Sequence, residues 1–111
     1  MKYGNRKVLV DGITFDSQAE ARRYGQLMIL QRAGRISGLT RQVAFELAPG
    51  VKLHGEKRAR PPVRYVADFV YSDPTQPGII IEDVKGMDTP LSRLKRHLMK
   101  TVHGLDVRVV R

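Results

Sequence analysis

Cysteine is absent from the 111-residue chain, which excludes a disulfide framework and a thiolate metal site. This absence suits a reducing cytoplasm. Long apolar runs are also absent: the longest aliphatic run, residues 79–81, is too short to cross a bilayer, and no N-terminal segment is typical of a signal peptide. There is no internal repeat and no low-complexity tract. The length fits one domain, residues 1–111, with a core of its own, and we expect this domain to be soluble.

Acidic residues are scarce relative to basic ones. The chain has 20 Lys and Arg residues against 11 Asp and Glu residues, which gives a net charge of +9. A small domain this basic is attracted to polyanions, and nucleic acid is the first candidate. An anionic membrane surface ranks below it, because no basic amphipathic helix carries a large exposed apolar face. An interaction module that binds an acidic protein is a further alternative.

The residue pattern predicts an α/β domain. We expect, in order, a flexible basic arm (1–7), a small hairpin (8–15), a helix (18–33), a strand (42–48), a polar loop (49–62), a strand (63–71), a turn (72–78), a strand (79–85), a helix that begins near 90 and ends at 104, and a last strand (105–110). Helix, three strands, helix and strand form an αβββαβ core. The connection through the second helix lets the last strand run parallel to a neighbour in a mixed sheet flanked by helices.

Two helix signatures place the helices more closely. Ser17 and Glu20 match a capping box, and Gly34 ends the first helix. Asp88 or Thr89 caps the second helix. The buried stripe of the first helix is predicted at Ala21, Tyr24, Leu27 and Met28, and the inward stripe of the second at Leu91, Leu94, Leu98 and Val102.

Charged residues interrupt two apolar strands. Asp68 stands inside the run Val66–Val70, and Asp83 and Lys85 share one face at the end of the next strand because side chains at i and i+2 point the same way. An isolated buried carboxylate is costly, whereas a divalent cation between Asp68 and Asp83 removes the penalty. Carboxylates, a main-chain carbonyl and waters suit Mg²⁺ or Mn²⁺.

Such a cation is what phosphodiester cleavage requires. It lowers the pKa of a bound water and offsets the charge that builds on the scissile phosphate. The ammonium group of Lys85 is placed to align that water or to stabilise the transition state. Glu20, in the first turn of the first helix, lies on the face that also carries Tyr24 and Leu27, and is therefore a candidate third carboxylate.

At these residues the chain resembles the PD-(D/E)xK nuclease superfamily, which includes restriction endonucleases, archaeal-type Holliday-junction resolvases and the TnsA transposase subunit. The segments that carry the resemblance are 15–21, 65–69 and 81–86, and it extends over nearly the whole chain. These segments look most like a family of small phage-encoded proteins labelled only as a domain of unknown function. For such a protein, the cytoplasm would be that of the host cell.

The resemblance implies roles for single residues. Asp68 and Asp83 would bind the metal, Lys85 would assist catalysis, and Glu20 would bind the metal directly or through water. The Val84 carbonyl would complete the shell. Gln42 would match a glutamine that some members place near the site. Glu82 is an alternative ligand to Asp83, because the superfamily motif often has Glu there, but Glu82 and Lys85 would then point to opposite faces.

Simpler interpretations stay open for these residues. Glu20 would be only the capping-box residue, and Asp83 with Lys85 only a salt bridge on one face of the strand. The three histidines are not spaced as a metal set; we interpret them as surface residues, with a phosphate contact from His54 as an alternative. No Ser/His/Asp order and no Gly-rich phosphate loop is present. Tyr65 and Tyr71 are interpreted as core residues rather than base-stacking platforms.

The sequence therefore favours a Mg²⁺- or Mn²⁺-dependent DNA endonuclease of phage or prophage origin. By resemblance, branched DNA such as a Holliday junction is the leading substrate, and a homodimer would deliver paired cuts. The alternative is a non-catalytic basic protein that binds nucleic acid and retains the fold. Backbone contacts are predicted for Lys57, Arg58 and Arg60 in the loop, and for Arg93, Arg96 and Lys100 in the second helix, although these residues would equally form a solvated face.

Overall fold

The computed structural model describes residues 6–111, so most of the predicted N-terminal arm lies outside the described residues. The element order is β1 (Val8–Val10), β2 (Ile13–Phe15), α1 (Gln18–Arg32), β3 (Ser37–Ala48), β4 (Val63–Ser72), β5 (Ile79–Val84), α2 (Pro90–His103) and β6 (Arg108–Val110). No helix in the described part of the chain is long and apolar enough to cross a membrane. The predicted order of helices and strands is confirmed.

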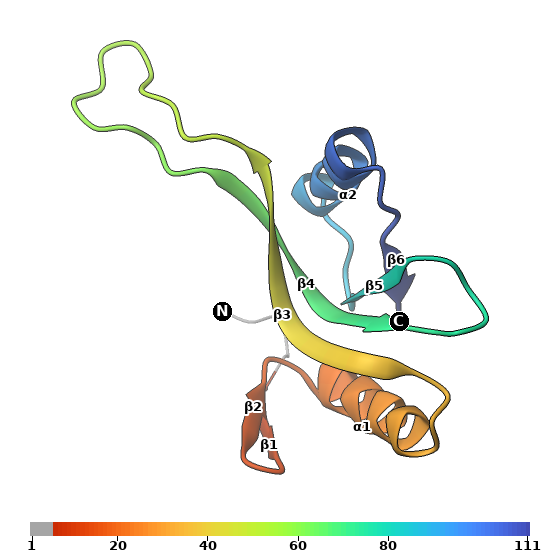
Figure 1. The fold of residues 1–111 in the computed structure, drawn as a ribbon. Coiled ribbons are helices and arrows are strands. Elements are labelled where there is room, and N and C mark those ends of the chain that lie inside the picture. The colour runs from red at the N-terminus through yellow and green to blue at the C-terminus, as the bar shows by residue number, and fades with distance from the viewer. Residues whose placement is uncertain (1–5) are drawn as a thin grey trace.

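The main sheet has four strands in the order β3-β4-β5-β6 (Figure 1). β3, β4 and β5 pair antiparallel, and β6 pairs parallel with β5, as the long connection through α2 predicts. β1 and β2 form a separate hairpin beside α1. Its turn, Asp11-Gly12, has positive φ at both residues (51° and 77°), as a type I′ turn requires.

The two helices cover opposite faces of this mixed sheet. On the α1 face, Leu27 packs with Phe69 and Ile80 in one buried cluster. On the α2 face, Met99 packs with Ala67 and Ile81 in a second cluster. Burial on both faces explains why β5 reads as a nearly continuous apolar run rather than as an alternating one.

The position of α1 follows from its cap and from a row of aromatic rings. The Ser17 hydroxyl accepts a hydrogen bond from the main-chain N–H of Glu20 (3.1 Å), which starts the helix as the capping pattern predicts. Tyr24 lies between the rings of Phe15 (5.1 Å between centroids) and Phe69 (6.3 Å). These contacts tie the hairpin, the helix and the sheet together, so that the first turn of α1 faces the middle of β4.

The inward stripe predicted for α2 is wrong. Leu91, Leu94 and Val102 are at least half exposed, and Met99 is the fully buried residue of this helix. The helix is turned because polar residues on its inner face have partners: Ser92 accepts from Lys85, and Arg96 pairs with Asp88. Thr89, rather than Asp88, is the N-cap, and Leu98 packs half-buried against the core. These polar contacts leave an apolar stripe on the outside of α2.

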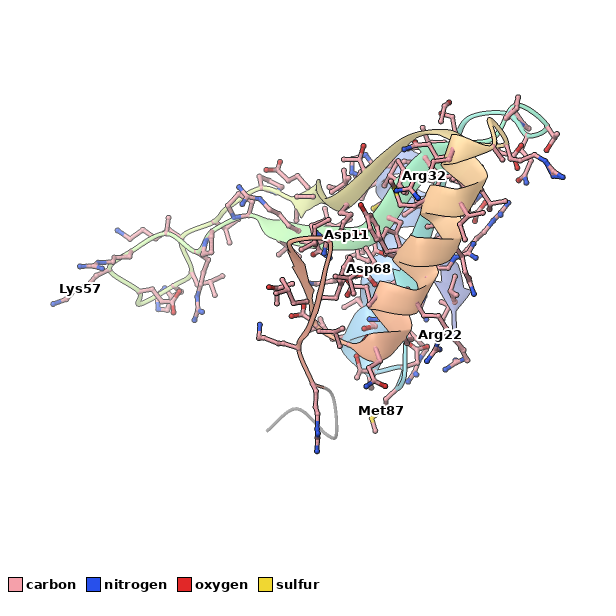
Figure 2. All side chains as sticks on the ribbon, turned by 90° about the horizontal axis from the view of Figure 1, so that it is seen from below. Asp11, Arg22, Arg32, Lys57, Asp68 and Met87 are labelled. Carbon is pink, nitrogen blue, oxygen red and sulfur yellow. The ribbon has the colours of Figure 1, made fainter. Side chains whose placement is uncertain are left out.

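The first long strand begins earlier than predicted, at Ser37 rather than at residue 42, and its hairpin partner is β4. Between these strands, residues 49–62 extend away from the body of the protein as an arm with Lys57 at its far end (Figure 2). A bridge between Val51 and Arg60 closes its base. Gly50 is required there, since a Cβ would lie 2.5 Å from the Arg60 carbonyl oxygen.

β4 changes face in its middle. Tyr65 and Ala67 pack on the α2 side, whereas Phe69 and Tyr71 pack on the α1 side, although a regular strand would place all four side chains on one face. The change occurs at Asp68. Opposite it in β3, Gln42 has a φ of +51° and is not among the paired residues, although the register is the same on both sides of it. This irregularity in the two strands lies where the candidate catalytic residues meet.

Candidate active site

One of the predicted acidic residues, Asp68, lies near two others, and the three come from different elements. Glu20 lies in the first turn of α1, Asp68 in the middle of β4, and Asp83 near the end of β5. Glu20 and Asp83 are each only 5% exposed, and Asp68 is partly buried. Burial of this many carboxylates in one place is unusual for a protein core.

Asp68 is the central carboxylate. Its Oδ2 accepts the main-chain N–H of Val84 at 2.7 Å, which fixes the side chain against the end of β5. Its Oδ1 accepts a longer bond of 3.3 Å from the Gln42 amide. The same Gln42 nitrogen donates to Oε2 of Glu20 at 3.4 Å. One amide group therefore bridges two acids, and the predicted position of Gln42 beside the site is observed.

Glu20 contributes its backbone and its side chain to different tasks. Its N–H completes the cap on Ser17, while its carboxylate faces Gln42 and the guanidinium of Arg41 (Nη2 to Oε2, 3.4 Å). Arg41 in turn lies over the ring of Phe15, 4.4 Å from its centroid. The Ser17 cap thus uses the Glu20 backbone, and the Glu20 carboxylate faces Arg41 and Gln42.

Asp83 and Lys85 share a face, as the strand spacing predicts. The Lys85 ammonium is 3.2 Å from Oδ2 of Asp83 and donates to the Ser92 hydroxyl at 2.9 Å. Ser92 belongs to the first turn of α2, whose N-cap is Thr89. The ammonium is therefore held between the end of β5 and the start of α2, next to the acids.

Glu82 points the other way. It is 1% exposed on the α1 face, where Nε and Nη2 of Arg23 donate to its two oxygens at 2.7 Å each, and the Tyr71 hydroxyl donates as well. Hydrogen bonds of this fork geometry satisfy the carboxylate fully. The oxygens of Glu82 are thus occupied by Arg23 and Tyr71, and Asp83 is the acid of this pair that lies beside Asp68.

The pKa values of Asp68 and Glu20 are raised. Burial raises the pKa of Asp68 to about 7, against the Val84 N–H that lowers it, and the negative charges of Glu20 and Asp83 add to the rise. Burial likewise raises the pKa of Glu20, which Arg41 offsets only in part. For Glu82 burial acts in the same direction, but Arg23 and Tyr71 outweigh it, and the pKa is lowered. Positive charge therefore outweighs burial at Glu82, whereas at Asp68 and Glu20 burial prevails.

The donor set suits a hard divalent cation in its chemistry, since it consists of carboxylates. Within residues 6–111, however, no three His, Cys, Asp or Glu side chains form a ready-made ligand group. The amide of Gln42 and the ammonium of Lys85 face the carboxylate oxygens instead, at 3.2–3.4 Å. These are long contacts, which a cation can replace at small cost because each of the bonds is weak.

The predicted backbone contacts divide into two groups. Lys57 and Arg58 are exposed on the arm, where Arg60 pairs with Glu56 (2.7 Å). Those of α2 are engaged: Arg96 is a bidentate partner of Asp88 (3.0 and 2.7 Å), Arg93 lies 3.8 Å from the same acid, and Lys100 pairs with Asp106 (3.0 Å). Free positive charge is therefore concentrated on the arm rather than on α2.

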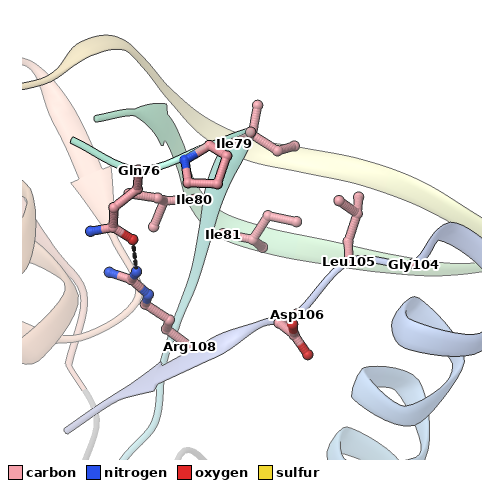
Figure 3. Close-up of a pocket in the computed structure, with 10 residues that line it drawn as sticks. Gln76, Ile79, Ile80, Ile81, Gly104, Leu105, Asp106 and Arg108 are labelled. Carbon is pink, nitrogen blue, oxygen red and sulfur yellow. Dashed lines mark hydrogen bonds between the residues drawn. The ribbon is translucent and has the colours of Figure 1, made fainter. Parts of the chain in front are cut away.

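Cavities lie on both sides of the acids. One of about 390 Å³ is lined by the start of α1, by Arg6 and Arg22, and by Val84 and Gly86. A second, of about 220 Å³, has Asp83 and Lys85 in its wall together with residues of β4 and α2. A third, of about 260 Å³, lies at the start of β5, where Arg108 donates to Gln76 (Figure 3). This last cavity contains none of the converging acids.

Sequence reasoning missed several residues beside the acids. Arg41 and Ser92 hold Glu20 and Lys85, yet an arginine in a strand and a serine in a helix carry no signal of such a role. Tyr65 is buried as predicted, but its hydroxyl has no hydrogen-bond partner among the described residues. The only sequence signal for a role of Tyr65 in the site is that it lies on the same strand as Asp68, two residues before the pair Ala67-Asp68.

A protein-family model described as "Protein of unknown function (DUF1064)" matches residues 1–110. No curated protein and no solved structure matches the chain.

Proposed function

The chain belongs to the DUF1064 family, and we propose that it is a metal-dependent endonuclease that hydrolyses phosphodiester bonds in DNA. The observation that carries the proposal is the convergence of Glu20, Asp68 and Asp83 beside Lys85. Asp68 and Glu20 have raised pKa values, and perturbed acids beside an ammonium group are typical of sites that do chemistry rather than of sites that stabilise a fold.

The arrangement of the chain supports a restriction-endonuclease-like core. Its αβββαβ order and mixed sheet place an acid on α1, an acid on the second strand of the meander, and Asp83-Val84-Lys85 on the third. These are the positions at which the PD-(D/E)xK pattern has its functional residues. We propose on this basis that the domain is a small member of that superfamily.

Asp68 and Asp83 would hold Mg²⁺ or Mn²⁺, with Glu20 as a further ligand, directly or through water. The Val84 carbonyl remains a proposed ligand, next to the N–H that binds Asp68. When bound, such a cation activates a water molecule and offsets charge on the phosphate. Gln42 contacts Glu20 and Asp68 together and would keep these two acids aligned.

Lys85 would stabilise the developing charge or orient the attacking water. Its ammonium group keeps one hydrogen bond to Ser92 that does not depend on the acids. This anchor at the start of α2 would hold the ammonium near the phosphate when the Asp83 carboxylate binds a metal cation in place of Lys85. Preorganised positive charge of this kind is the main way in which a protein lowers such a barrier.

The arm would bind the DNA backbone. Lys57 stands at its far end, well away from the body of the protein (Figure 2), and the next residue, Arg58, is also exposed. Contacts with phosphates carry no sequence information, so we propose recognition of DNA structure, with branched DNA as the leading substrate. A pair of cuts would require two copies of the chain.

The second candidate is a non-catalytic protein that binds nucleic acid. The net charge of +9 and the basic arm favour DNA binding under either hypothesis. The raised pKa of Asp68 speaks for catalysis, because a site retained only for binding phosphates has no use for three acids.

One experiment separates these candidates. Supercoiled plasmid and a four-way junction are incubated with wild type, Asp83→Ala or Lys85→Ala, in Mg²⁺, in Mn²⁺ or in EDTA. We expect cutting by wild type only, dependent on the metal, with DNA binding retained in both variants. Binding without cutting by wild type would leave the non-catalytic function. Equal cutting by either variant would remove the proposed mechanism.

A further inference from the structure

The cavity of about 220 Å³ next to Asp83 has two kinds of wall. Asp83 and Lys85 form its polar side, and Lys95 of α2 stands at its rim. The other lining residues are Tyr65 and Val66 of β4 and Leu91 and Ser92 of α2, of which Val66 and Leu91 supply aliphatic groups. The cavity therefore combines carboxylate, ammonium and hydrocarbon groups within one small volume.

Both aliphatic side chains of the lining are exposed to solvent. Val66 is 46% exposed, at an exposed position of the alternating pattern of β4, and Leu91 is 60% exposed in the first turn of α2. The helix presents Leu91 outward because Ser92, the next residue, is turned in toward Lys85. The contact that anchors the ammonium thus also places Leu91 on the wall of the cavity.

The floor of the cavity contains an unpartnered polar group. Tyr65 lines it, is 4% exposed, and has a hydroxyl oxygen without a hydrogen-bond partner among the described residues. Leaving a buried hydroxyl unsatisfied is destabilising, and such a group in a native protein calls for an explanation. A phenolic hydroxyl is protonated at neutral pH and can donate a hydrogen bond.

These features fit part of a nucleotide. A cavity of this size is smaller than the ~300–1,000 Å³ typical of pockets for drug-sized ligands. Hydrocarbon walls suit the face of a deoxyribose ring, and ammonium groups with a hydroxyl donor suit a phosphate. The mixture excludes a purely anionic ligand such as free phosphate as the best occupant, since phosphate would leave the apolar wall without a contact.

We propose that this cavity binds one sugar–phosphate unit of the DNA strand beside the scissile bond, with Leu91 and Val66 against the deoxyribose and with Lys95 and the Tyr65 hydroxyl on the phosphate. The inference rests on the proposed endonuclease function, because the cavity shares Asp83 and Lys85 with that site. It adds four residues that the sequence assigned to core, stripe or surface. It also explains why recognition is independent of base identity.

The test uses thymidine 5′-monophosphate, inorganic phosphate and thymidine, each titrated into the full chain in Mg²⁺ and followed by amide NMR. We expect the nucleotide to shift the amides of Val66, Leu91 and Lys95, and to bind at least tenfold more tightly than either fragment alone. Equal affinity for phosphate and nucleotide, or shifts confined to the arm, would overturn the proposal.

Variants with matched controls sharpen the test. Leu91→Ala should weaken nucleotide binding at least threefold, whereas Leu94→Ala, equally exposed one turn further along α2, should not. Lys95→Gln should weaken binding similarly, and Arg32→Gln, which removes the same charge from the end of α1, should not. If Leu91→Ala and Leu94→Ala behave alike, the apolar wall has no role.

Tyr65→Phe gives an independent measurement. Removing an unsatisfied hydroxyl should leave the melting temperature unchanged or higher, yet should weaken nucleotide binding. A lower melting temperature with unchanged binding would show a structural hydroxyl and contradict the assignment.

The two proposals fail separately. Nucleotide binding in this cavity without any DNA cleavage by wild type would remove the endonuclease and keep the site. The opposite outcome is also possible: wild type cleaves DNA, and Leu91→Ala and Lys95→Gln change neither KM nor nucleotide affinity. That result would support the endonuclease and contradict the proposed nucleotide site.

Discussion

Glu82 and Asp83 are adjacent in the chain but stand in opposite environments. Glu82 faces α1, where Arg23 and Tyr71 satisfy both of its oxygens and lower its pKa. Asp83 faces the other side of the sheet, where its ion-pair partner is the Lys85 ammonium and a second acid, Asp68, has its pKa raised to about 7. The same strand thus carries one carboxylate that is paired with an arginine, Glu82, and one that lies beside another carboxylate, Asp83.

The difference separates two uses of a buried acid. A carboxylate with a bidentate arginine holds two elements together, and loss of either partner leaves a buried charge. A carboxylate among other carboxylates is a cost to the fold, and it is retained where a ligand relieves that cost. We therefore expect substitutions at the two positions to have opposite consequences.

The largest expected effect is on cleavage. Asp83→Asn should reduce the rate of plasmid cutting by about 1,000-fold or more, because it removes a charged metal ligand while preserving shape. Its melting temperature should stay at or above that of wild type. A variant that cuts normally would show that Asp83 has no part in the reaction.

The complementary substitution is Glu82→Gln. It should lower the free energy of unfolding by about 2–4 kcal/mol, since Arg23 then lacks its anionic partner. Urea unfolding measures this change, with Asp83→Asn as the control of equal charge loss. At a temperature where the variant is folded, cutting should persist. Destabilisation by Asp83→Asn and not by Glu82→Gln would invert the comparison.

The pH dependence of stability tests the cost of burying Asp68 beside other acids. The folded-state pKa of Asp68 is raised to about 7 from 3.8, so the folded protein binds more protons than the unfolded chain between these values. Stability without metal should therefore fall as the pH rises from about 4 to 7, by on the order of 1–3 kcal/mol. Asp68→Asn should remove that slope in urea unfolding measured across this pH range. A slope that is unchanged in the variant would assign the effect to other groups.

The smallest expected effect concerns the arm. Replacing Lys57 and Arg58 by Ala should reduce the slope of log affinity against log salt by about 2, which is about one per phosphate contact. The melting temperature should not change, because both side chains are exposed. Fluorescence anisotropy with a labelled four-way junction measures the slope. The double variant Arg93→Ala/Arg96→Ala tests the competing surface on α2. If it reduces the slope of log affinity against log salt more than the arm variant does, the DNA binds to α2 rather than to the arm.

Local signals in the sequence were sufficient for much of the fold. The cap at Ser17, the Asp11-Gly12 turn, and Pro90 and Gly104 at the two ends of α2 each act over a few residues, and all are present in the structure. The shared face of Asp83 and Lys85 follows from strand geometry alone and is likewise observed.

Features that depend on distant contacts were not predictable. The rotation of α2 is set by Ser92 meeting Lys85 and by Arg96 meeting Asp88, and an apolar stripe cannot report such contacts. The change of face in β4 at Asp68 depends on the backbone of Gln42 in the partner strand. Glu82 is held away from the site by Arg23 of α1, and this contact between distant residues has no local signal in the sequence.

The central claim is that Asp68 and Asp83, with Glu20, form a site for a divalent cation. Calorimetric titration of Mn²⁺ into the metal-free protein at pH 8 tests it most directly, with Asp83→Asn and Glu82→Gln measured alongside. We predict saturable binding by wild type and by Glu82→Gln, and loss of binding in Asp83→Asn. Absence of binding by wild type, or equal binding by Asp83→Asn, would contradict the account.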